Sequence, residues 1–195
     1  MFEIEYITFK INIKYIIFII LIFIFVYIKL KLRLIVKKKT SLNMIGYKLI
    51  YTDQSTKEKQ KNVIYGKILK SKKYDLQGKP DFIFKGYILG NIVPMELKSG
   101  NIGNSKVPHK GDLLQLVSYF IIIQDIYNIK PFYGKLVYKD YMFVVRNTRK
   151  LRKEVMRTLN NMRIMMRTGN GRANPSFINC RYCVCKNTVC KYYKR

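Results

Sequence analysis

Two short apolar segments joined by a glycine-bearing turn place the strongest constraint on the fold of this chain. DFIF (81–84) and IVPMELK (92–98) have the apolar, β-branched and aromatic character of strands, and GYILGN (86–91) is typical of the turn between them. GDLLQLVSYFIIIQDIY (111–127) follows with apolar residues at three- and four-residue spacing, which predicts a helix. Because Pro94 lacks a backbone N–H, we expect its strand to lie at a sheet edge or to contain a bulge.

Further elements are predicted on both sides of this hairpin. They are strands at 47–51, 134–138 and 141–145, and a helix over 149–167 that Asn147-Thr148 would cap and Thr168-Gly169 would end. Strands in hairpins with helices interposed indicate a mixed α/β fold, with helices flanking a mixed sheet. The expected organisation is an N-terminal anchor with a basic flank (1–39), a linker (40–62), a core domain (63–168) and a cysteine-rich tail (169–195).

The N-terminal segment contains fourteen consecutive uncharged residues, YIIFIILIFIFVYI (15–28). Lysines bound this run and can reach the membrane interface, so residues 11–30 would supply the roughly 20 residues that cross a bilayer. A cleaved signal peptide is disfavoured because no Ala or Gly follows before Gly46. A buried helix is disfavoured by Ile and Phe on every face. We therefore expect one transmembrane helix, with the cation-rich C-terminal side in the cytoplasm.

Three polar residues of the predicted hairpin carry the candidate chemistry. Because strand side chains alternate between faces, Glu96 and Lys98 should project on one side with Leu97 opposite. Asp81 opens the neighbouring strand and can meet Glu96 across the hairpin. Two carboxylates at this spacing can hold a hard divalent cation, and Lys98 can orient a water or stabilise developing charge. An isolated Glu-x-Lys is more often a cross-strand salt bridge, so the hypothesis depends on the surrounding pattern.

That pattern is present in order along the chain. Gly78 precedes Asp81 by three residues, Ser99-Gly100 ends the second strand, and Gln115 and Tyr119 lie four apart on one helix face. Together, GKPDFIF, IVPMELKSG and HKGDLLQLVSY resemble the RecB-type nucleases of the PD-(D/E)XK superfamily. Within that superfamily the chain is most similar to the CRISPR-associated Cas-four family and its small stand-alone relatives. The resemblance covers residues 60 to 190 and implies a restriction-endonuclease-like sheet.

The resemblance also implies an activity and a role for each motif residue. The implied activity is metal-dependent, exonuclease-like hydrolysis of DNA, and the anchor expected from the N-terminal segment would tether this nuclease to the cytoplasmic face of a membrane. For Tyr119 alone, a place in the core is the alternative. The implied residues are Asp81, Glu96 and the Leu97 carbonyl as ligands of Mg or Mn, Lys98 as the catalytic lysine, and Gln115 and Tyr119 as residues that position DNA.

One departure from the family pattern supports a different function. Full-length members usually carry a metal-binding histidine upstream of the aspartate, whereas the single histidine of this chain, His109, lies downstream. Glu58 is the candidate substitute. The alternative is therefore a membrane-tethered DNA-binding protein with a degenerate nuclease site. A membrane or scaffold protein is a third hypothesis, but it leaves the ordered motifs unexplained.

The net charge of +27 fits a polyanionic partner, either nucleic acid or an anionic membrane surface. A coding bias toward Lys, Ile and Asn gives the same excess, so charge alone does not identify the partner. Four lysines flank the candidate site and are expected to contact phosphates without sequence preference: Lys79, Lys85, Lys106 and Lys110.

All the cysteines lie near the C-terminus, at Cys180, Cys183, Cys185 and Cys190. Such a cluster indicates metal binding rather than a disulfide framework, and four thiolates can hold zinc or an iron–sulfur cluster. The resembling family binds a four-iron cluster with one N-terminal and three C-terminal cysteines. Because no cysteine precedes Cys180, Cys185 would have to serve as the fourth ligand. Zinc at the same thiols and a metal-free tail remain the alternatives.

Overall fold

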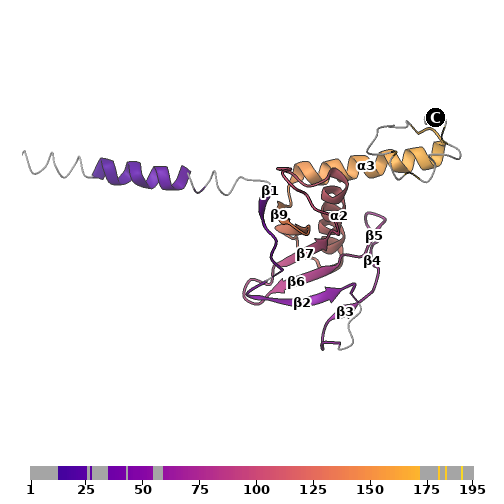
Figure 1. The fold of residues 1–195 in the computed structure, drawn as a ribbon, viewed down its shortest axis with the longest axis horizontal. Helices are drawn as coiled ribbons and strands as arrows, with labels where there is room; N and C mark the ends of the chain where they lie inside the picture. Colours follow the sequence, from indigo (N-terminus) through magenta and orange to yellow (C-terminus); the bar gives the residue numbers. More distant parts are fainter. Residues whose placement is uncertain are drawn as a thin grey trace, which may run out of the picture. The chain divides into compact units, whose positions relative to one another are not determined.

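A mixed sheet of seven strands forms the centre of the first of two compact units, residues 1–152 and 153–195. The structure, a computed structural model, describes residues 13–25, 27, 35–42, 44–54, 59–171, 180, 183 and 190. The strand order is β1-β9-β8-β7-β6-β2-β3 (Figure 1). The strands are β1 (Ile35–Lys39), β2 (Tyr47–Thr52), β3 (Ile64–Tyr65), β6 (Phe82–Gly86), β7 (Ile92–Leu97), β8 (Tyr133–Val137) and β9 (Tyr141–Arg146). The expectation of a mixed α/β fold is confirmed.

The predicted hairpin lies in the middle of this sheet as the antiparallel pair β6 and β7, with Phe82 opposite Met95. The chain then passes through helix α2 (Lys110–Tyr127) and returns as β8, which is parallel to β7. The edge position expected from Pro94 is wrong, because β7 is the fourth of the seven strands. Proline is tolerated there because the parallel ladder with β8 begins only at Met95, one residue later.

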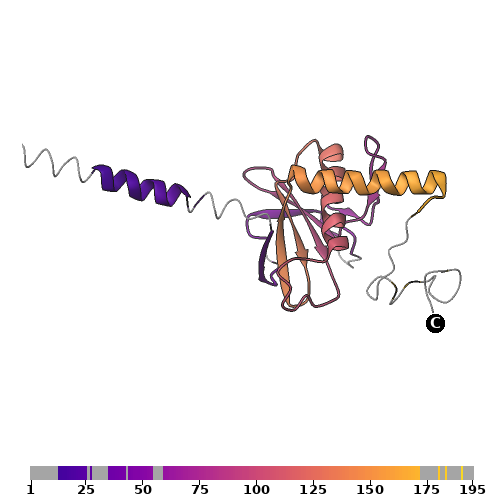
Figure 2. The ribbon, with the colours of Figure 1, turned by 90° about the horizontal axis from the view of Figure 1, so that it is seen from above.

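Helix α2 covers one face of the sheet over β7 and β8, as Figures 1 and 2 both show. The close approach depends on Gly134 of β8. A Cβ atom at this position would lie 2.7 Å from the Phe120 ring, 3.0 Å from Leu116 and 3.0 Å from the carbonyl oxygen of Pro94. On the opposite face, Met95, Val137 and Met142 form a buried cluster, against which partly buried residues pack: Met44, Phe82, Phe84 and Leu97.

Replacing Gly134 by alanine is expected to destabilise the domain by about 1–3 kcal/mol, because the added methyl group overpacks a dense core. The measurement is urea unfolding followed by circular dichroism. Gly111→Ala is the matched control, since no atom lies within 4 Å of a Cβ at this α2 position. That control should be neutral or stabilising by up to about 1 kcal/mol. Equal midpoints for both variants would show that α2 and β8 are not tightly packed.

Two smaller elements complete the described fold. The strands β4 (Leu69–Ser71) and β5 (Leu76–Gly78) form a separate antiparallel hairpin that contacts α2. Helix α3 (Arg149–Thr168) begins where the Thr148 hydroxyl accepts a hydrogen bond from the Leu151 N–H, at 3.3 Å. It ends at Gly169, whose φ of +69° suits the last turn of a helix. Both ends match the predicted helix.

The expected transmembrane helix is wrong, and so is the single-pass membrane location with a cytoplasmic domain that followed from it. No helix in the described ranges combines the length and the apolar character needed to cross a membrane. Residues 13–25 are helical, but at about 1.5 Å per residue they span roughly 20 Å of a hydrocarbon core about 30 Å thick. Residues 11, 12, 26 and 28–30 of the expected span lie outside the described residues.

Candidate functional site

The β6–β7 hairpin brings Asp81 and Glu96 together at one end. Asp81 immediately precedes β6, and its Oδ2 accepts a hydrogen bond of 2.7 Å from the Leu97 N–H of β7. Glu96 projects toward α2, where its Oε1 accepts a bond of 2.7 Å from Gln115 Nε2. Leu97 lies on the opposite face in the apolar cluster, as strand alternation predicts. The pairing of β6 with β7 therefore brings together two carboxylates that are separated in the sequence.

Glu96 is the most unusual ionisable group of the site. The residue is only 6% exposed, and its Oε2 atom is buried without a hydrogen-bond partner among the described residues. Burial raises the pKa of Glu96 above its ordinary value, and the negative charge of Asp81 raises it further. A buried carboxylate oxygen without a partner is energetically costly. A bound cation would remove that cost.

Lys98 follows β7 directly, and its Nζ has three acceptors. The distances are 2.7 Å to Gln115 Oε1, 3.2 Å to Glu96 Oε1 and 3.2 Å to Asp112 Oδ1. Burial alone would lower the pKa of Lys98, but the charges of Glu96 and Asp112 outweigh burial and raise it. Lys98 is therefore an ammonium at neutral pH. It can donate hydrogen bonds and stabilise negative charge, but it cannot act as a general base.

The predicted motif residues Gln115 and Tyr119 lie on the face of α2 that faces this site. Gln115 bridges Glu96 and Lys98 through its two amide atoms, and its Nε2 also lies 2.8 Å from the Tyr119 hydroxyl. Tyr119 is 5% exposed, and its hydroxyl donates a 3.3 Å hydrogen bond to the Lys79 carbonyl. Burial raises the pKa of Tyr119 far above its ordinary value. The core position considered for Tyr119 is thus observed, and Gln115 contacts the charged residues directly.

Two residues near the site were missed by the sequence analysis. Asp112, in the first turn of α2, contacts Lys98, and its Oδ2 accepts a 2.6 Å hydrogen bond from the Tyr138 hydroxyl. Asp112 could have been found, because it lies three residues before Gln115 and so shares its helix face. Tyr138 follows β8, and only the folded sheet brings it to Asp112.

The donor set suits a hard divalent cation. Asp81 and Glu96 supply carboxylate oxygens, and the Leu97 carbonyl points to the same side of β7 as the Leu97 N–H that binds Asp81. Mg²⁺ is commonly held by one or two carboxylates together with waters and substrate phosphates. Within the described ranges, no group of three or more His, Cys, Asp or Glu residues could hold a metal. The ring of His109 instead packs edge-to-face on the ring of Tyr138, with 5.9 Å between the ring centroids. Glu58 lies outside the described residues.

The four flanking lysines are placed differently from one another. Lys79 forms an ion pair with Asp53, and Lys106 and Lys110 are exposed on the loop before α2 and in its first turn. Lys85 is four residues along β6 from Asp81, about 13 Å away at 3.3 Å per residue. Its expected contact with phosphate at the same site is therefore not supported by its position.

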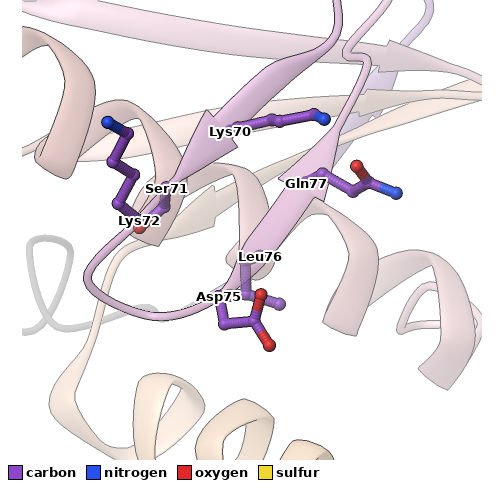
Figure 3. Close-up of a pocket in the computed structure, with 6 residues that line it drawn as sticks. All are labelled: Lys70, Ser71, Lys72, Asp75, Leu76 and Gln77. Carbon is purple, nitrogen blue, oxygen red and sulfur yellow. The ribbon is translucent and has the colours of Figure 1, made fainter.

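A cavity of about 340 Å³ lies at the β4–β5 hairpin (Figure 3). Lys70 and Gln77 face each other across its two strands. The hairpin is tied to α2 by a 2.7 Å hydrogen bond from the Ser71 hydroxyl to Asp125 Oδ2. None of the predicted site residues is among the six that line this cavity.

Three of the tail cysteines are described, Cys180, Cys183 and Cys190, and they are free thiols. The Cys183 N–H donates a 3.3 Å hydrogen bond to the Cys180 carbonyl, so these two residues lie close together. Cys-x-x-Cys pairs occur in zinc and iron–sulfur sites. Cys185, the expected fourth ligand, lies outside the described residues.

Comparison of the chain with protein-family models and with curated proteins gives no match in either case.

Proposed function

We propose that this chain is a metal-dependent DNA nuclease of the PD-(D/E)XK type. The observation that carries the proposal is the buried Glu96 Oε2, which has no hydrogen-bond partner among the described residues, beside Asp81 and the ammonium of Lys98. A structural salt bridge between Glu96 and Lys98 would not explain a buried Glu96 oxygen that has no donor among the described residues, nor the second negative charge of Asp81 beside it. A cation that binds a phosphate accounts for both.

The proposed reaction is hydrolysis of a phosphodiester. Asp81, Glu96 and the Leu97 carbonyl would hold Mg²⁺ or Mn²⁺, which when bound polarises a phosphoryl oxygen and lowers the pKa of a nearby water. Lys98 donates hydrogen bonds to the attacking water or to an equatorial phosphate oxygen, where negative charge grows. The water oxygen bonds to phosphorus and releases a proton to solvent, the ester P–O bond breaks, and the leaving oxygen takes up a proton from solvent. Gln115 holds the side chains of Glu96 and Lys98 in position.

A DNA-binding protein with reduced catalysis is the second candidate. It is favoured by one observation, namely that the described part of the chain supplies only two carboxylates and no histidine to the metal position. Such a protein would keep the electrostatic attraction to DNA that follows from its charge of +27.

Cutting of labelled single- and double-stranded DNA by the full chain tests the proposal. We expect cutting with Mg²⁺ or Mn²⁺ and none with EDTA, because the reaction needs the cation. Gln115→Ala should slow single-turnover cutting by about 10-fold, as is usual for residues that orient metal ligands. If the protein binds DNA but cuts neither single- nor double-stranded DNA with either metal, a DNA-binding protein with reduced catalysis is the better account.

For the cysteine tail, we propose a four-iron cluster at Cys180, Cys183, Cys185 and Cys190, with zinc as the alternative. The hydrogen bond that brings Cys180 and Cys183 close together supports metal binding but does not distinguish the two. Iron, sulfide and zinc analysis of the anaerobically purified chain decides between them. A chain that contains none of the three would have a metal-free tail.

A further inference from the structure

We propose that Asp112 and Tyr138 form an anchor that holds the Lys98 ammonium in place, which makes Asp112 a positioning residue for the hydrolysis. This inference rests on the proposed function, since it concerns the lysine of that same site. The motif residues do not include either member of the anchor. The structure nevertheless links both to Lys98 through two consecutive contacts.

The two oxygens of Asp112 have separate partners. Oδ1 lies 3.2 Å from Lys98 Nζ, and Oδ2 accepts a 2.6 Å hydrogen bond from the Tyr138 hydroxyl. A short O–H···O bond to a carboxylate is among the stronger hydrogen bonds in proteins and is directional. The Asp112 carboxylate therefore cannot rotate to present Oδ2 to Lys98 unless its hydrogen bond to Tyr138 breaks. The hydrogen bond to Tyr138 fixes which oxygen of Asp112 faces the ammonium, and it fixes the position of that oxygen.

Tyr138 is itself held rigidly. It is 3% exposed, and its ring meets those of Phe143 and His109 edge-to-face, with centroids 5.9 Å away in both cases. Its backbone N–H donates a 2.9 Å hydrogen bond to the Tyr141 carbonyl in the β8–β9 turn. Burial first, and then Asp112, raises the pKa of Tyr138, so the hydroxyl keeps its proton and remains a donor. Tyr138 is thus attached to the sheet, whereas Asp112 belongs to α2.

The anchor matters most when Glu96 is engaged elsewhere. Without a cation, Lys98 is held by two carboxylates, those of Glu96 and Asp112. A cation beside Glu96 competes for its negative charge and weakens its attraction for the ammonium. Asp112 takes no part in the metal site, so its full charge remains available to Lys98. The lysine would then be positioned mainly by Asp112 and Gln115 at the moment when it is needed.

The test uses the full chain with Asp112→Asn and Tyr138→Phe. Asp125→Asn, on the same helix, and Tyr133→Phe, which loses a hydroxyl bonded to Tyr47, are matched controls. We expect Asp112→Asn to lower the single-turnover cutting rate by about 10- to 100-fold. Tyr138→Phe should lower it less. Mn²⁺ affinity and DNA affinity should stay within about twofold of wild type, since neither residue touches the metal position. The double variant should be no slower than Asp112→Asn, because both act through one contact.

A second readout does not depend on cutting. In a ¹⁵N spectrum of lysine ammonium groups, the Lys98 signal, assigned by its loss in Lys98→Arg, should be sharp in wild type and in both controls. It should broaden or vanish in Asp112→Asn and Tyr138→Phe, while thermal unfolding shows that these variants fold. An unchanged Lys98 signal in Asp112→Asn overturns the anchor. If wild type never cuts but the signal responds as expected, the proposed function fails while the anchor stands.

Discussion

Replacing Glu96 by glutamine is expected to abolish metal-dependent cutting, by about 10³-fold or more, without destabilising the metal-free protein. The substitution keeps the size of the side chain and one acceptor for Gln115, but it removes the charge that would bind the cation. Lewis-acid stabilisation of the transition state is worth several kcal/mol, and each 1.36 kcal/mol corresponds to a tenfold change in rate. Loss of the cation alone therefore accounts for the expected effect.

The stability half of this prediction follows from the raised pKa of Glu96. A carboxyl whose pKa is higher in the folded state than in the unfolded state destabilises the fold when it ionises. That cost is absent below the ordinary glutamate pKa and reaches its full size above the folded-state pKa. The wild type should therefore lose stability as pH rises through this window, and Glu96→Gln should not lose it.

Thermal unfolding between about pH 4 and 8, with and without Mn²⁺, measures both effects. Mn²⁺ should stabilise the wild type at the upper end of this range and leave Glu96→Gln unchanged, because binding to the folded state stabilises it. Glu154→Gln, at a glutamate of α3 that is not part of the motif, should behave as wild type in cutting and in the response to Mn²⁺. Retained cutting in Glu96→Gln would exclude Glu96 as a metal ligand.

Lys98→Met is expected to lower the single-turnover cutting rate by about 10²- to 10³-fold, as is found when one donor to a developing charge is removed. Methionine keeps most of the aliphatic length but removes the ammonium. DNA affinity should fall little, because one charge among many contributes weakly to binding by a chain of +27. Lys98→Arg should also cut poorly, since a planar guanidinium does not reproduce the directions of three separate acceptors.

The control for Lys98 is a buried lysine on another strand of the sheet. Lys135, on β8, is 9% exposed, and its pKa is lowered by burial and then by Lys38. Lys135→Met should leave cutting unchanged and stability equal or higher, because it removes a charge that the fold disfavours. If Lys135→Met slows cutting as much as Lys98→Met does, the loss reflects general damage to the sheet and the role proposed for Lys98 is wrong.

Local pattern was enough to predict the central elements, because their residue types and spacing are characteristic of their secondary structure. The apolar segment 92–98 beside a glycine-bearing turn predicted β7, and the three- and four-residue spacing in 111–127 predicted α2. The predicted hairpin placed Asp81 next to Glu96, helical spacing put Gln115 and Tyr119 on one face, and the family resemblance implied that this face lies beside the metal position. Each of these inferences needed only one hairpin and one helix face.

Elements that depend on distant partners were not predictable in this way. The segment IVKKK appeared to be a basic flank, yet it is the strand β1, which exists because it pairs with β9 more than a hundred residues later. The three-residue strands β4 and β5 are too short to show a period, and α2 supports them through Asp125. The edge position predicted from Pro94 is wrong for the same reason, because the residue at which β7 begins to pair with β8 is set by the tertiary fold.

The two outer strands of the sheet have a consequence for how the protein behaves at high concentration. An exposed strand edge is a template on which another molecule can add a strand and aggregate. At one edge, β1 carries Lys37, Lys38 and Lys39 in succession, and the Lys37 ammonium bonds the Ser105 carbonyl at 2.9 Å, which draws a loop toward that edge. At the other edge, β3 is only two residues long. Addition of another strand is thus disfavoured at both edges of the sheet. Part of the excess of lysine therefore protects the protein from aggregation.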